Sequence, residues 1–185
     1  MHQPFVRIPF AVVLLLAMAP ASGSASSTQT ETATTTVIVV RHAEKVDDSR
    51  DPALSEAGMK RAQALGEMLE HAGLDAVYAS QYQRTRLTAE PAAQAAGLGV
   101  TVEPIEGDIE AWAEAFAAEL VEKHPGETVL IAGHSNTLPP LVAALCRCGI
   151  EPLADSDYDR IYILNMAEQG SHPRFHLVRA RYGKP

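Results

Sequence analysis

The stretch Thr36-Val-Ile-Val-Val-Arg-His-Ala-Glu-Lys45 decides how the rest of the chain is interpreted. Four β-branched apolar residues run without interruption into an arginine and a histidine. An apolar run with no polar alternation is typical of a strand that is buried on both faces. In open α/β sheets, ligands bind at the carboxyl ends of the strands. We therefore expect Arg41 and His42 to lie at the floor of a pocket.

A second apolar stretch, also expected to form a strand, is followed by another histidine. Residues 128–132 are apolar after Thr128, and Gly133-His-Ser-Asn136 follows directly. The next residues, 138–145, continue as a helix. Because a helix amino terminus is itself favourable for anions, His134 is expected on the same rim as His42.

After residue 45, the first elements expected are two helices with a strand between them. Ser55 is a cap for a helix whose apolar stripe runs through residues 62, 65, 69 and 72, and Gly73 ends it. Residues 74–79 form a short strand, and Ser80 can cap the next helix, which Pro91 is expected to kink or interrupt. Arg84 lies in the first turn of that helix, where a cation opposes the helix dipole. A bound anion would explain its position.

The remaining pattern completes an α/β order. Residues 100–103 form a weak strand, and Asp108 caps a helix with an apolar face that ends near His124, expected at the surface. Residues 160–164 and 174–178 read as two final strands, paired through Gln169-Gly170. This order predicts an α/β fold, a three-layer sandwich with a mostly parallel central sheet and helices on both faces.

The amino-terminal residues carry a pattern typical of export. Arg7 precedes a short apolar run, residues 10–19, and small residues follow. The run is too short for a membrane-spanning helix. We therefore expect a signal peptide over 1–25, a flexible lead-in over 26–35 and a catalytic domain over 36–185, with no stable membrane anchor after cleavage. The expected location is periplasmic or secreted, and an uncut anchor is the alternative.

Composition narrows the class of partner. The chain has 185 residues and a formal net charge of −8, and an acidic surface argues against nucleic acid as a partner. Cys146 and Cys148 are the only cysteines. Their spacing is expected to be too short for a relaxed disulfide with each other, and two ligands are too few for zinc. We expect thiols near a helix end, with an intermolecular disulfide as the alternative.

Arg41, His42, Arg84 and His134 together suit phosphoryl transfer. Two arginines supply paired donors for phosphate oxygens. Nearby cations should keep His42 neutral and therefore nucleophilic. An attacking nitrogen surrounded by positive charge is what a phosphohistidine intermediate requires. No metal or other cofactor is expected, since the arginines can carry this charge. Each residue alone would be a weak signal, because isolated arginines and histidines are more often surface or core residues.

Four stretches resemble the histidine phosphatase superfamily, in the branch that includes phosphoglycerate mutases and small bacterial phosphatases. They are Arg41-His-Ala-Glu-Lys45, Leu54-Ser-Glu-Ala-Gly58, the stretch 78–91 and Gly133-His-Ser-Asn136. The resemblance runs from about Val37 to Leu164. It implies that His42 is the phosphorylated nucleophile and that Arg41, Arg84 and His134 bind the phosphoryl group of a small phosphorylated substrate, such as an envelope sugar phosphate.

The sequence departs from the family's pattern at the general acid, the residue that would protonate the leaving oxygen. The glutamate that mutase-like members carry after the stretch 78–91 has no recognisable context here. Glu103, Glu106 and Asp108 lie in the right part of the chain, and Asp108 or Glu106 is favoured. If none of them reaches the leaving oxygen, good leaving groups such as aryl phosphates or phosphohistidine are expected.

The sequence is compatible with three functions. The favoured one is a phosphomonoesterase that acts through phospho-His42. A phosphoglycerate-type mutase is the second, although the loops over 46–52 and 100–108 are short for retaining a sugar-acid phosphate. The third is a non-catalytic module that binds phosphorylated molecules. This alternative stays open because the sequence has no recognisable context for the general acid.

Overall fold

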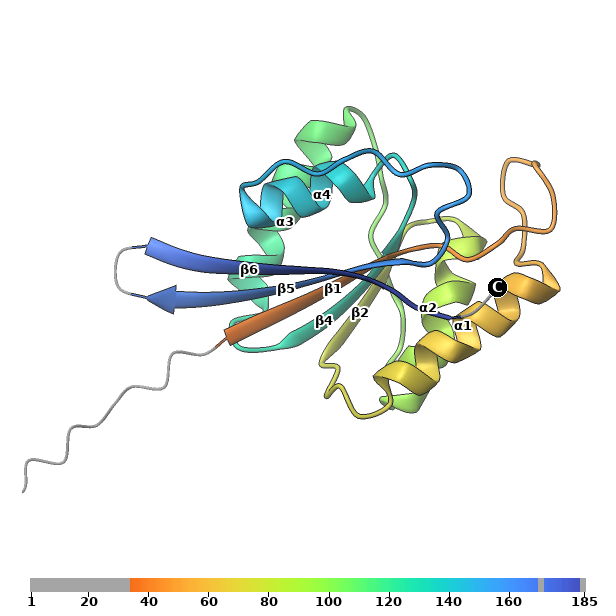
Figure 1. Cartoon of the computed structure of the whole chain (residues 1–185), viewed down its shortest axis with the longest axis horizontal. Helices are drawn as coiled ribbons and strands as arrows, with labels where there is room; N and C mark the ends of the chain where they lie inside the picture. The colour runs from red at the N-terminus through yellow and green to blue at the C-terminus, as the bar shows by residue number, and fades with distance from the viewer. Residues whose placement is uncertain (1–33, 170–171, 184–185) are drawn as a thin grey trace, which may run out of the picture. The chain divides into compact units, whose positions relative to one another are not determined.

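The computed structural model describes residues 34–169 and 172–183, and the predicted signal peptide lies outside them. Within these residues, six strands form one sheet in the order β3-β2-β4-β1-β5-β6 (Figure 1). The strands are β1 (Thr34–Arg41), β2 (Ala76–Ala79), β3 (Thr101–Val102), β4 (Thr128–Gly133), β5 (Arg160–Gln169) and β6 (His172–Arg181). β1 to β4 are parallel, and the hairpin of β5 and β6 is antiparallel. The turn predicted at Gln169-Gly170 falls partly outside the described residues.

The apolar run in β1 packs on both faces of the sheet because successive side chains of a strand point to opposite sides. Val37 and Val39 join the core that includes residues of α3 and α4, whereas Ile38 and Val40 join the core with α1 and α2. All four are nearly or fully buried. The predicted three-layer sandwich is therefore confirmed.

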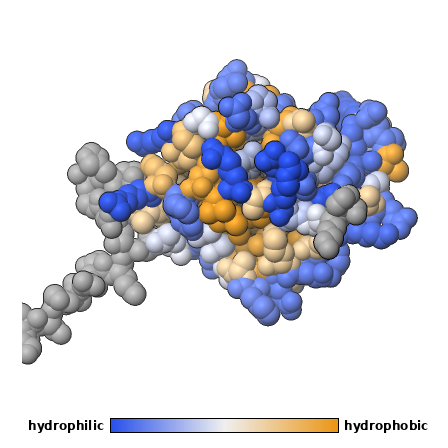
Figure 2. Space-filling model, viewed as in Figure 1, coloured by the Kyte–Doolittle hydropathy of each residue, from blue (hydrophilic) through white to orange (hydrophobic). Residues whose placement is uncertain are grey.

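The helices cover the two faces in pairs (Figure 1). They are α1 (Glu56–Leu69), α2 (Gln83–Ala95), α3 (Ile109–Lys123) and α4 (Leu138–Cys146). The predicted caps of two of them are confirmed, since Ser55 accepts from the Gly58 amide and Asp108 accepts from the Ala111 amide. None of the described helices is long and apolar enough to cross a membrane. Polar and charged side chains cover much of the face seen in Figure 2, with apolar groups exposed between them.

Several local predictions need correction. β1 begins at Thr34, inside the segment predicted as a flexible lead-in. α2 continues through Pro91 instead of being interrupted. Its cap is Tyr82, so Ser80 is not the cap. His124 is buried, with its ring nitrogens hydrogen-bonded to the Tyr78 hydroxyl at 2.9 Å and to Glu127 at 2.6 Å. Tyr78 is on β2 and Glu127 follows the helix end. The local pattern around His124 does not include these contacts, and it therefore predicted a surface position for this residue.

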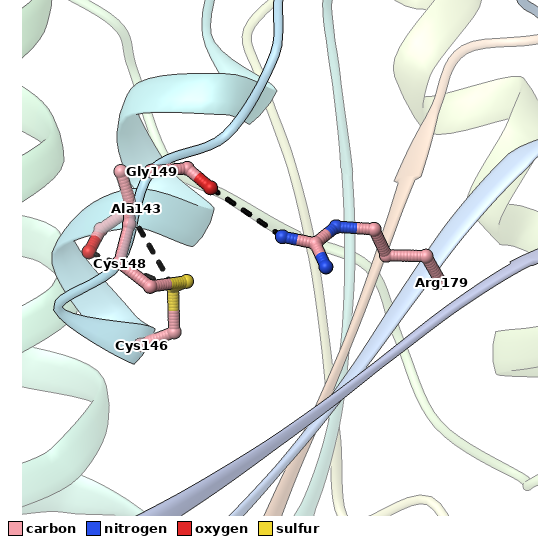
Figure 3. Close-up of a disulfide and its surroundings, with 5 residues drawn as sticks. All are labelled: Ala143, Cys146, Cys148, Gly149 and Arg179. Carbon is pink, nitrogen blue, oxygen red and sulfur yellow. Dashed lines mark hydrogen bonds between the residues drawn. A yellow bond between two sulfur atoms is a disulfide. The ribbon is translucent and has the colours of Figure 1, made fainter.

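Cys146 and Cys148 form a disulfide with each other, which contradicts the expectation of thiols (Figure 3). Arg147 between them has a positive φ of 53°. This left-handed conformation turns the chain back at the end of α4 and brings the two Cα atoms to 5.2 Å, within the usual range for a disulfide. Sequence spacing alone does not reveal that backbone turn.

Candidate active site

A cavity of about 370 Å³ lies at the carboxyl ends of β1 and β4. Arg41 ends β1, while His134 follows β4 directly. The cavity is lined by the four predicted residues Arg41, His42, Arg84 and His134, together with others that include Lys45, Tyr82, Asn136 and Asp155. The prediction that the four residues share one rim is therefore confirmed.

The hydrogen bonds of His42 identify its free nitrogen. Its Nδ1 lies 2.8 Å from the carbonyl oxygen of Ala43. Because a carbonyl only accepts, Nδ1 carries the proton and Nε2 keeps a lone pair. Burial lowers the pKa of His42 to about 4, and the charges of Arg41, Arg84 and Lys45 act in the same direction. The neutral, nucleophilic form is thus the one present at neutral pH.

His134 is held by a chain of hydroxyl groups. Its Nε2 lies 2.8 Å from Ser80 Oγ, which lies 2.8 Å from Thr85 Oγ1. Its Nδ1 is 3.3 Å from Nη2 of Arg84, a group that can only donate. His134 therefore accepts at Nδ1 and donates from Nε2 to Ser80. Burial, followed by the charge of Arg84, lowers its pKa to about 3.

The two arginines approach the cavity from different elements. Arg41 is 4% exposed, and its Nη1 donates to the carbonyl oxygens of Ala154 and Asp155, each at 2.9 Å. The ring of Tyr158 lies 4.1 Å from its guanidinium carbon. Arg84, on α2, packs 4.5 Å from the centre of the Tyr82 ring. Both guanidinium groups therefore lie beside the two histidines, whose ring centres are 5.3 Å apart.

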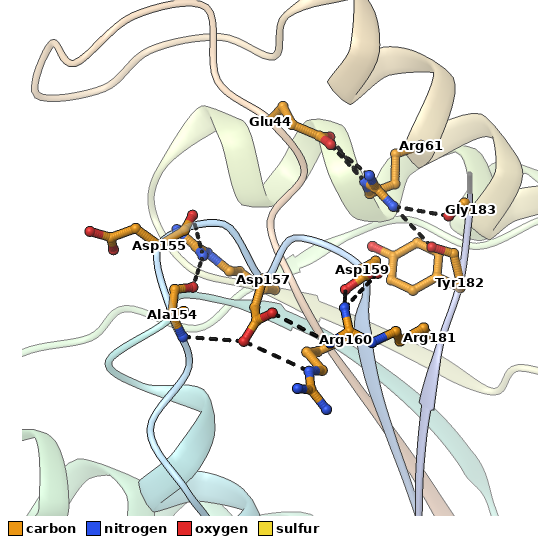
Figure 4. Close-up of polar contacts among 11 residues, drawn as sticks. Glu44, Arg61, Ala154, Asp155, Asp157, Asp159, Arg160, Arg181, Tyr182 and Gly183 are labelled. Atoms are coloured by element: carbon orange, nitrogen blue, oxygen red, sulfur yellow. Dashed lines mark hydrogen bonds and ion pairs between the residues drawn. The ribbon is translucent and has the colours of Figure 1, made fainter. Parts of the chain in front are cut away.

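The turn after His42 is held by α1. Glu44 accepts from Nε and Nη2 of Arg61, which is 5% exposed (Figure 4). Gly58 packs so closely here that a Cβ atom at this position would lie 2.1 Å from the Glu44 carbonyl oxygen. The Ala43 amide donates to Thr88 Oγ1 on α2 at 2.9 Å. The backbone that carries His42 is thus held by two helices.

The structure does not bring the favoured acid candidates to the cavity. Asp108 caps α3, its carboxylate accepting from the Ala111 amide at 2.9 Å. Glu106 is exposed, and neither it, Asp108 nor Glu103 is among the cavity-lining residues. Burial raises the pKa of Glu103, but this residue lies beside Trp112 and Phe116 in a separate small cavity. The role of Glu106 or Asp108 as proton donor therefore stays a prediction.

Sequence reasoning missed the groups that hold the four central residues. The sequence pattern predicts Ser80 as a helix cap and indicates no role for Tyr158 or Asp155, although Asp155 lines the cavity. The ring centre of Tyr158 is 5.9 Å from that of His42. No local pattern marks these contacts, because Ser80 and Tyr158 are far from their partners in the sequence.

Comparison with known proteins agrees with this geometry. The family model of the histidine phosphatase superfamily (branch 1) matches residues 37–111. Phosphoserine phosphatase 1 of Hydrogenobacter thermophilus is 39% identical over 97 residues, covering 48% of this chain and 46% of the relative. The match thus spans about half the length of that curated relative.

Solved structures share the fold at low sequence identity. Mycobacterial hydrolase 2 has a TM-score of 0.67 at 17% identity, covering 82% of this chain and 93% of that one. Mycobacterial glucosyl-3-phosphoglycerate phosphatase in complex with VO3 has a TM-score of 0.61 at 17% identity, covering 77% and 96%. These solved structures show that the fold is shared, and the family model of the histidine phosphatase superfamily (branch 1) matches the part of the chain that carries Arg41, His42 and Arg84.

Proposed function

We propose that the chain is a histidine phosphatase that hydrolyses phosphate monoesters through a phosphohistidine at His42. One observation carries the proposal: Nδ1 of His42 is bonded to the Ala43 carbonyl, which leaves an unprotonated Nε2 on a cavity lined by two arginines. The named phosphatases among the similar proteins support the same class of reaction.

In the proposed first step, Nε2 of His42 attacks phosphorus and the bond from phosphorus to the ester oxygen breaks. Arg41 and Arg84 lie where they can stabilise the charge on the other phosphoryl oxygens, and His134 holds Arg84 by accepting from its Nη2. The leaving oxygen takes a proton from water and departs as the alcohol. Water then attacks the phosphohistidine, which releases inorganic phosphate and restores neutral His42.

We further propose that substrates with good leaving groups react fastest. Asp155 is the one carboxylate residue among the cavity-lining residues of the described chain, and it is exposed. Weak protonation of the leaving oxygen penalises alkyl phosphates more than aryl phosphates or phosphohistidine. Phosphoserine and sugar phosphates enter as candidate substrates because the similar phosphatases carry such names.

An exported location, in the periplasm or outside the cell, is also proposed. The amino-terminal pattern over residues 1–25 motivates it, and the Cys146–Cys148 disulfide supports it because disulfides persist mainly in oxidising compartments. Expressing the full chain in a bacterial host and finding the uncleaved protein in the cytoplasm, with both thiols free to alkylation, would contradict this proposal.

The test of the activity is a phosphatase assay with an aryl phosphate on residues 26–185. His42→Ala should abolish turnover, whereas His71→Ala, which alters an exposed histidine, should retain it. Rapid acid-free quenching should trap phosphate on His42 of the active protein. Unchanged hydrolysis by His42→Ala would contradict the proposal. Vanadate binding without turnover on any phosphate ester would favour the non-catalytic binding module instead.

A further inference from the structure

The segment between α4 and β5 holds the guanidinium of Arg41. Arg41 Nη1 donates to two successive carbonyls of this segment, Ala154 and Asp155, and Tyr158 stacks on the guanidinium. Two carbonyl bonds and a stacked ring fix the plane of a guanidinium, which must be correct for paired contacts with phosphoryl oxygens. The position of Arg41 therefore depends on the shape of residues 154–158.

That shape is set by Asp157. Its Oδ2 accepts from the amide of Ala154 at 3.2 Å, and its own amide donates to the carbonyl of Ala154 at 3.0 Å (Figure 4). The carbonyl of Ala154 thus accepts from both Asp157 and Arg41. The Asp157 carboxylate, 18% exposed, also lies 3.8 Å from Arg160 Nε and 3.7 Å from Arg181 Nη2.

The beginning of the segment is fixed as well. It leaves α4 through the Cys146–Cys148 disulfide, and Arg179 of β6 donates to the carbonyl of Gly149 at 3.4 Å (Figure 3). Asp157 lies between this fixed start and β5. It is the side chain in the segment that joins the carbonyl turn to the cationic side chains of the final hairpin.

We propose that Asp157 is a positioning residue for phosphoryl transfer: it shapes the turn whose carbonyls orient Arg41 beside His42. The inference rests on the proposed function, since it assigns Arg41 to the phosphoryl group. It goes beyond that function by identifying a residue outside the cavity lining that controls the cavity's chemistry. Loss of the Asp157 carboxylate removes the bond to the Ala154 amide and lets the turn relax, so Arg41 loses its fixed orientation.

The test compares three variants with the unsubstituted chain. Asp157→Ala removes both the acceptor and the charge, whereas Asp157→Asn keeps an oxygen that can accept from Ala154. Asp159→Ala is the matched control, because Asp159 binds the same Arg181 at 2.6 Å but does not contact the Ala154 turn. Thermal unfolding, kcat, KM and the vanadate dissociation constant are measured for each.

Asp157→Ala should lower kcat on an aryl phosphate by about ten- to a hundredfold, as expected for a misplaced catalytic group, and weaken vanadate binding. Asp157→Asn should recover most of this loss. Asp159→Ala should keep kcat near that of the unsubstituted chain even where its melting temperature falls as far. Equal losses of kcat in Asp157→Ala and Asp159→Ala would overturn the proposal, because ion-pair loss alone would explain both.

The pH profile separates positioning from stability. The groups around His42 are Arg41 from β1, Lys45 from the following loop, Arg84 from α2, His134 after β4 and Tyr158 from the segment itself. Displacing Arg41 removes a positive charge beside His42, so the acid limb of kcat/KM in Asp157→Ala should move to higher pH. Removing the negative charge of Asp157 alone would move it to lower pH, and that result would contradict the proposal.

Measuring vanadate binding allows the positioning role of Asp157 to be tested independently of the phosphatase activity. If the unsubstituted chain hydrolyses no phosphate ester, the proposed function fails. The positioning role then still requires weaker vanadate binding by Asp157→Ala than by Asp159→Ala, and equal affinities would overturn it.

Discussion

Lowering the pH from 8 to 5 should destabilise this protein through the histidine that we assign as the nucleophile. Burial lowers the pKa of His42 to about 4, and the neighbouring cations contribute in the same direction. The histidine of an unfolded chain has a pKa of about 6.5. Between these two values the unfolded chain binds a proton that the folded chain does not bind.

The size of the effect follows from these two pKa values. At pH 5 nearly all unfolded chains carry the proton on His42, but only about one folded chain in ten does. Proton binding therefore favours the unfolded state by about 2 kcal/mol at pH 5 relative to pH 8. The contribution is fully present above pH 6.5 and is lost progressively as the pH falls toward 4.

The assay is urea unfolding at pH 8 and pH 5, followed by the fluorescence of Trp112, the only tryptophan. The drop in unfolding free energy between the two pH values should be about 2 kcal/mol smaller in His42→Gln than in the unsubstituted chain. His71→Gln, altered at an exposed histidine, is the control and should keep the full drop. An equal drop in His42→Gln and in the unsubstituted chain would refute the assignment of a buried, neutral His42.

Three other perturbations test the support around the site. Gly58→Ala should destabilise the fold by about 2 kcal/mol or more, since its Cβ would meet the Glu44 carbonyl at 2.1 Å; Gly99→Ala, with open space around it, should be nearly neutral in the same urea titration. Glu44→Gln should cost about 3 kcal/mol because it leaves Arg61, 5% exposed, without its charged partner, and an unchanged melting temperature would argue against that ion pair. Replacing both Cys146 and Cys148 by serine should cost about 1.5 kcal/mol from the entropy of a three-residue ring, and mass spectrometry of the alkylated, unreduced chain checks that the bond is present.

The sequence predicted much of the fold because its signals are local. The apolar run 37–40 must be buried on both faces, and the residues after it must then lie at the carboxyl end of a strand. The same reasoning placed His134 at a neighbouring strand end. The parallel pairing of β1 with β4, Arg41 opposite Gly133, brings the two histidines together. Fold class and the four central residues therefore followed from periodicity and spacing.

Other features depend on groups that meet only in the folded chain. The tautomer of His134 is set by Arg84, 50 positions away, and Arg41 is held by carbonyls more than 110 positions away. Backbone carbonyls carry no residue-specific signal, so no sequence pattern could indicate them. The disulfide likewise required the left-handed conformation of Arg147. The sequence by itself placed Arg41, His42, Arg84 and His134 at the cavity, whereas tertiary contacts decided their protonation, their orientation and which carboxylates lie near them.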